Sequence, residues 1–102
     1  MKYYIVHGKY LIPFGELTQL GDLVQEHRAY VQQEYESGKY LLSGPEVPAE
    51  SGVVIARAES RAELDALMAA EPFVREGKVQ ITRVVEFQPA RSQPYLGDWV
   101  GA

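Results

Sequence analysis

The chain contains no cysteine, which excludes disulfide bonds and thiolate chemistry. It has no long apolar run: the segment 3–6 is too short for the core of a secretion signal, and no window approaches the length of a membrane span. Basic residues are scattered and number 10 against 14 acidic ones, and the net charge of -4 disfavours nucleic-acid binding. We therefore expect no membrane and no nucleic-acid partner, and a cytoplasmic location.

The usual cofactor motifs are missing as well. The two histidines, His7 and His27, do not show the paired spacing of a metal site. Gly8, Gly38 and Gly77 each precede a lysine, but the earlier glycine and the following Ser or Thr of a phosphate loop are absent. We expect neither a metal nor a cofactor.

What the chain does contain is a regular order of strand and helix patterns. Aromatic and β-branched residues predict strands at 2–11, 39–42, 52–58 and 79–87. Three-and-four spacing predicts a helix from about Leu17 or Leu20 to Ser37 and another from about 61 to 71. Gly38 is placed as a left-handed cap, and Ser60 with Glu63 has the spacing of a capping box. The segment 43–45 should end the second strand in a turn.

This order, βαββαβ, predicts a ferredoxin-like α+β domain with a four-stranded antiparallel sheet over residues 1–89. Two helices cover one face of such a sheet, yet strand pairs such as Val53 with Val54 and Val84 with Val85 are apolar on both faces. A second copy is the expected cover, which predicts a homodimer or a dimer-based oligomer. The tail 90–102 carries Tyr95 and Trp99 and should dock on the neighbouring subunit.

One titratable residue interrupts each helix stripe. The first stripe has His27 at its centre, and the second reaches Glu71 after Leu67 and Met68. Burying either group alone removes its hydration without compensation, whereas burying both as a hydrogen-bonded pair is tolerable. We therefore expect His27 and Glu71 to be paired. The structural alternatives are a packed histidine bonded to backbone and a carboxylate that turns to solvent.

Two motifs carry a resemblance to a known family. One is Gly38-Lys39 with Leu-Leu-Ser-Gly-Pro at 41–45, and the other is Glu-Pro-Phe-Val-Arg-Glu-Gly at 71–77. Together with His27, they make residues 2–89 resemble the YciI-like family. The resemblance implies a dimeric α/β barrel and an active site built on a histidine and an aspartate. His27 matches the histidine, whereas Glu71 stands in place of the aspartate and is one methylene longer.

Further candidates surround the pair. Ser43, Gly44 and Pro45 either form a simple turn or offer backbone donors to an anionic substrate. Phe73 either fills the core or forms a pocket wall. His7 and Arg57 lie on strands, and the face that they occupy depends on the strand register.

The predicted pair suits general acid-base chemistry, because a carboxylate orients the imidazole while the free nitrogen moves a proton. We expect a cofactor-free enzyme of lyase or isomerase type that acts on a small organic acid or aromatic catabolite. One alternative is a non-catalytic small-ligand-binding or accessory protein. Another is a cofactor-free monooxygenase of the same barrel.

Overall fold

The structure, a computed structural model, describes residues 1–101. Its four strands are β1 (Lys2–Tyr10), β2 (Tyr40–Pro45), β3 (Ser51–Ala58) and β4 (Val79–Phe87). Its long helices are α2 (Asp22–Glu36) and α3 (Arg61–Ala70), and its short ones are α1 (Phe14–Leu17), α4 (Pro72–Arg75), η1 (Pro94–Leu96) and α5 (Gly97–Val100). Among the described residues, no helix is long and apolar enough to cross a membrane.

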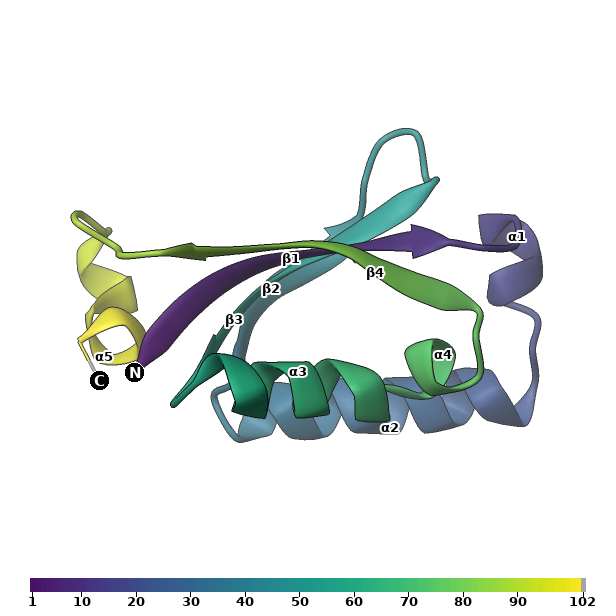
Figure 1. The fold of residues 1–102 in the computed structure, drawn as a ribbon, viewed down its shortest axis with the longest axis horizontal. Helices are drawn as coiled ribbons and strands as arrows, with labels where there is room; N and C mark the ends of the chain where they lie inside the picture. The colour runs from purple at the N-terminus through teal and green to yellow at the C-terminus, as the bar shows by residue number, and fades with distance from the viewer. Residues whose placement is uncertain (102) are drawn as a thin grey trace.

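The strands form one antiparallel sheet in the order β2-β3-β1-β4. Both long helices and α4 lie on the same side of it, while α1 and α5 lie near opposite ends (Figure 1). The predicted ferredoxin-like α+β fold is therefore confirmed, although the single chain does not show a dimer.

The core lies between the sheet and the helices. Even-numbered residues of β1 face the helices, and Tyr4 and Val6 are fully buried there beside Ala56 of β3. Leu64 and Met68 of α3 pack against them. This is the period-2 pattern of strands meeting the three-and-four spacing of a helix.

The opposite face of the sheet carries a second apolar surface. The register aligns Ile5 with Ile55 and Val85, and Leu42 lies opposite Ile55. Leu42 is 64% exposed. We call Ile5, Leu42, Ile55 and Val85 the open face.

Local signals determine where several elements begin and end. Gly38 has a φ of 80° just after α2, as the expected left-handed cap requires. Ser60 caps α3 by accepting from the backbone N–H of Glu63 at 3.1 Å. Glu63 in turn accepts from the N–H of Glu59 rather than from that of Ser60.

Three boundaries differ from the prediction. The helix predicted from about Leu17 or Leu20 begins at Asp22, just after Gly21 with its φ of 59°, and the separate short helix α1 precedes it. Residues 43–45 do not end β2 but continue it to Pro45; β2 is an edge strand, and proline is tolerated at such a position. The short helix α4 was not predicted, and it begins at Pro72, where a missing N–H is harmless.

The tail folds back onto its own chain beside the N-terminus (Figure 1). The Trp99 indole N–H donates to the Gly38 carbonyl at 2.7 Å, and Arg57 donates to the Trp99 carbonyl at 2.6 Å. The rings of Trp99 and Tyr3 lie 5.4 Å apart. Docking of the tail on a neighbouring subunit stays a prediction.

Candidate functional site

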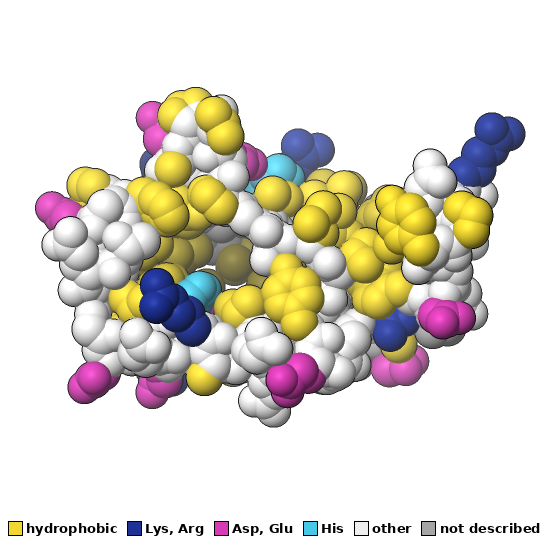
Figure 2. Space-filling model, turned by 180° about the vertical axis from the view of Figure 1, so that it is seen from behind, with side chains coloured by type: hydrophobic (Ala, Val, Ile, Leu, Met, Phe, Trp, Pro, Cys, Tyr) yellow, Lys and Arg dark blue, Asp and Glu magenta, His cyan; other side chains and the backbone are white. Residues whose placement is uncertain are grey.

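A cavity of about 330 Å³ opens between α2, β2, β3 and α4. Hydrophobic side chains surround the hollow in Figure 2, and a histidine lies beside a basic side chain near its rim. The size is at the lower end of the range typical of small-molecule sites. The lining contains all six predicted site residues, namely His27, Ser43, Gly44, Pro45, Glu71 and Phe73.

His27 and Glu71 meet across the helix layer. Nδ1 of His27 is hydrogen-bonded to Oε1 of Glu71. The other carboxylate oxygen accepts from the Val74 N–H at 3.1 Å, so Glu71 also caps α4. Pro72 explains the placement, because the residue before a proline is disfavoured in helical geometry and Glu71 is extended, with a ψ of 127°.

The carboxylate favours one tautomer of the imidazole. An ionised carboxylate only accepts hydrogen bonds, so with Glu71 ionised Nδ1 is the donor in this bond and Nε2 is the remaining nitrogen. The Glu71 side chain is 10% exposed and the His27 side chain 31% exposed. The imidazole is thus the accessible end of the pair.

Phe73 holds the imidazole in its plane. Its ring stacks on that of His27 with centroids 4.1 Å apart and an angle of 15° between the planes. Phe73 is itself buried in a cluster with Leu17 and Val24. The stack and the carboxylate together restrict the rotation of the imidazole.

Ser43, Gly44 and Pro45 line the cavity from β2. The Ser43 hydroxyl lies 2.5 Å from that of Tyr35, which links β2 to α2. No histidine contacts this serine among residues 1–101, so it lacks the base that a nucleophilic serine requires.

Two tyrosines of the helix–sheet layer stay neutral. Burial, reinforced by Glu34 and Glu71, raises the pKa of Tyr30 to about 12. Burial also raises the pKa of Tyr40, which lines the cavity, well above the usual range. The Tyr30 hydroxyl donates to the Leu67 carbonyl at 2.5 Å and ties α2 to α3.

His7 and Arg57 lie on the other side of the sheet. The register pairs His7 with Val53 and Arg83 on the odd-numbered face of β1. Nδ1 of His7 lies 2.9 Å from a Glu46 carboxylate oxygen. A hydrogen bond from Ser51 lowers the pKa of Glu46 most, and the hydrogen bond with His7 lowers it further. Neither His7 nor Arg57 lines the cavity.

Several residues that line the cavity were not predicted from the sequence. Arg28 lines the cavity from α2, and Tyr10 and Phe14 line it from β1 and α1 with their rings stacked 5.5 Å apart. The signal for Arg28 was its position four residues after Val24 and three before Val31. Glu34, a buried carboxylate seven residues after His27, was also not predicted, and it lies outside the cavity lining.

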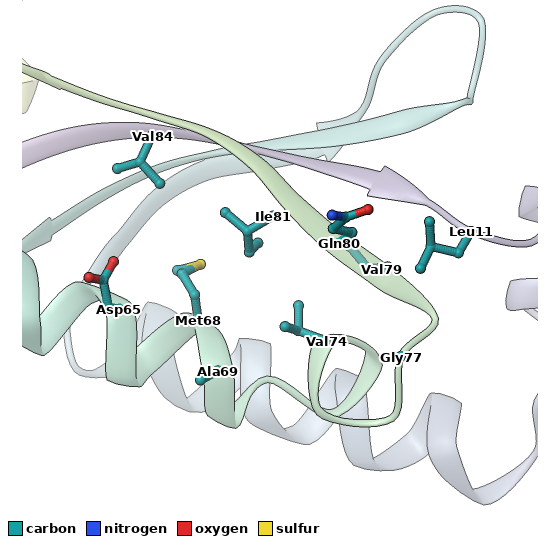
Figure 3. A pocket seen from close by; sticks show the side chains of 10 residues that line it. All are labelled: Leu11, Asp65, Met68, Ala69, Val74, Gly77, Val79, Gln80, Ile81 and Val84. Carbon is teal, nitrogen blue, oxygen red and sulfur yellow. The ribbon is translucent and has the colours of Figure 1, made fainter.

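A second hollow lies between α3, α4 and the edge strand β4 (Figure 3). Its volume is about 400 Å³, and its lining is mostly aliphatic, with Met68, Val74, Val79 and Ile81 shared with the first cavity. Asp65 is the one charged residue lining it within the described chain, and Arg61 already pairs with that carboxylate. The first cavity is therefore the better candidate for chemistry.

Solved structures, but no curated proteins, are similar to this chain. No curated protein matches it, whereas nine chains of solved structures do. One is 5-chloro-2-hydroxyhydroquinone dehydrochlorinase (TftG) from Burkholderia phenoliruptrix AC1100, in complex with 2,5-dihydroxybenzoquinone. It is 19% identical, with a TM-score of 0.59 over 90% of this chain and 96% of that one, and it shows likeness of fold.

The family itself is shown by a sequence model. The model of the YCII-related domain matches residues 2–88, which span the sheet and all helices up to the tail. The chain belongs to the YCII-related domain family.

Proposed function

We propose that this protein is a cofactor-free enzyme in which His27 and Glu71 move a proton on a small organic acid or aromatic catabolite. The observation that carries the proposal is the hydrogen bond between His27 Nδ1 and Glu71 in the wall of an apolar cavity. A base for proton transfer needs a fixed tautomer and a free nitrogen, and this bond supports both.

The reaction class follows from the side chains around the pair. The chain has no cysteine, and the Ser43 hydroxyl is hydrogen-bonded to Tyr35 rather than to a base. The proposed reaction therefore proceeds without a covalent intermediate. Base-promoted elimination and proton-shift isomerisation both include the removal of a proton from carbon. TftG is named as a dehydrochlorinase, and loss of hydrogen chloride is such an elimination. We therefore propose a lyase or isomerase type of reaction.

We also propose that two copies pack through their open faces. Ile5, Ile55 and Val85 form an apolar strip that the helices do not cover, and burial of such a strip favours association. The cavity lies on the other side of the sheet, so each copy would keep its own site. The cytoplasmic location stays a prediction.

The test is hydrogen–deuterium exchange at carbon. The protein is incubated in D₂O with a panel of hydroxyquinones, ring-hydroxylated benzoates and small enolisable acids, and exchange or product formation is followed by proton NMR. We expect at least one compound to exchange with the natural protein and to stop exchanging with the His27→Gln variant. The circular dichroism of that variant should remain native.

A contrary result has a defined meaning. If panel members bind in the cavity but none exchanges or reacts, the protein is the non-catalytic ligand-binding alternative. If exchange persists in His27→Gln, the proton is moved by another group and the proposal is wrong.

A further inference from the structure

Helix α2 presents one continuous face to the cavity. Val24, His27, Arg28 and Val31 all line it, at positions i, i+3, i+4 and i+7. Arg28 therefore lies on the same face of α2 as His27.

Arg28 has no internal partner among the described residues. Three of the other arginines are engaged: Arg75 pairs with Glu26, Arg61 pairs with Asp65, and Arg57 donates to backbone carbonyls. Arg28 is exposed, and within residues 1–101 it is the one Lys or Arg that lines this cavity. Its guanidinium is thus available to a ligand.

The interior of the cavity is unsuited to a negative charge. Its lining is mainly aliphatic and aromatic, and the carboxylate of Glu71 in that lining would repel an anion. Burying an unpaired charge there is costly, whereas a guanidinium at the rim offers paired, charge-assisted hydrogen bonds to a carboxylate. An anionic ligand is therefore best placed with its charge on Arg28 and its apolar body inside.

We infer that Arg28 anchors the anionic group of the substrate, which is a carboxylate or ionised enol oxygen on a body of about one ring. The inference rests on the proposed function, since it concerns the same cavity. It adds the substrate class, a small anion, and a specificity-determining residue. Because Arg28 and His27 are adjacent on α2, an anchored anion holds the carbon skeleton near the imidazole.

Binding of benzoate and benzamide tests this inference without requiring turnover. The two probes have nearly the same shape and differ in charge. Each is titrated into the isotopically labelled protein, and the shifts of cavity residues are followed by NMR. We expect benzoate to bind at least about tenfold more tightly than benzamide, with a preference that weakens as salt increases.

Variants of the arginines provide the comparison. Arg28→Gln should remove the preference for benzoate and leave benzamide binding unchanged, and Arg28→Lys should restore part of it because the charge returns without the planar fork. Arg91→Gln is the matched control: Arg91 is exposed and lines neither hollow, so this variant should behave as the natural protein.

The outcomes separate this inference from the proposed function. Equal binding of the two probes, no binding of either, or a preference that survives in Arg28→Gln overturns the anchor, even if His27-dependent exchange is observed. A preference that depends on Arg28 and persists in His27→Gln supports the anchor, even if no compound exchanges.

Discussion

Glu71 uses its two carboxylate oxygens for two different partners. One accepts from the Val74 N–H and caps α4, and the other bonds to His27. The same side chain thereby fixes a helix start and the orientation of an imidazole. This double role gives a reason for a carboxylate at this position, since an ionised carboxylate accepts through both oxygens.

The Glu71→Gln variant tests the tautomer. An amide has one acceptor oxygen and one donor nitrogen, so if the oxygen keeps the Val74 N–H, the nitrogen donates to Nδ1 of His27. The ring proton then moves to Nε2, which can no longer act as a base. We expect kcat/KM to fall on the order of 10²- to 10⁴-fold, and the ¹⁵N shifts of the His27 ring to report the change of tautomer.

Two companion variants complete that experiment. Glu71→Asp keeps a carboxylate, as in the family pattern, and should retain part of the activity. Glu26→Gln changes an exposed carboxylate beside His27 in sequence and should leave the ring shifts unaltered. Unaltered ring shifts in Glu71→Gln would show that the carboxylate does not set the tautomer.

At the scale of elements, Trp99 makes most of the contacts that hold the tail against the sheet. Its indole N–H donates to the Gly38 carbonyl, its ring packs at a tilt against that of Tyr3, and the Arg57 guanidinium lies 5.1 Å from the indole centroid. Tyr95, in the same tail, is 82% exposed. The tail thus has Trp99 and Val100 docked on its own chain, whereas Tyr95 is exposed and available to a second copy.

These two residues should give different phenotypes. Trp99→Ala removes a hydrogen bond, a cation–π contact and ring packing, so we expect a loss of about 1–3 kcal/mol in the free energy of unfolding. Tyr95→Ala should change it by less than about 0.5 kcal/mol. Urea denaturation measures both; equal, small effects would show that the tail does not stabilise the domain.

Deletion of residues 91–102 extends the same experiment to assembly. If the tail also docks on a neighbouring subunit, its removal should lower the oligomer mass at low concentration as well as the stability. Loss of stability with an unchanged mass would place its whole contribution within one chain.

At the scale of the molecule, the sheet separates two apolar surfaces. The helix side holds the cavity, and the open face carries an aliphatic strip. Separate faces allow association without occlusion of the candidate site. The proposed homodimer therefore requires no rearrangement of His27 or Glu71.

The Leu42→Glu variant tests the dimer. Leu42 is on the open face, and a charge there would face the apolar strip of the second copy without a partner, which disfavours association. By light scattering at micromolar concentration we expect a dimer, or a multiple of one, for the natural protein and a monomer for the variant. Leu11→Glu is the control, because Leu11 is 48% exposed but lies at the hollow beside β4. A natural protein of monomer mass would contradict the proposal.

The sequence alone determined what depends on near neighbours in the chain. Aromatic and β-branched runs located all four strands, and three-and-four spacing located both long helices. Gly38 and Ser60 marked helix ends, and Pro72 marked the end of α3. The interruption of two apolar stripes led to His27 and Glu71, because a titratable group on a buried face needs a partner.

The tertiary structure decided what depends on register and on contacts between distant segments. Strand parity, which a shift of one residue reverses, placed His7 and Arg57 away from the cavity. Pairing with β3 kept residues 43–45 in a strand despite their turn-forming composition. Packing of α2 against the sheet and α4 brought Arg28 to the cavity. Helical spacing places Arg28 on the same face as His27, but the cavity beside that face is formed by the surrounding strands and α4.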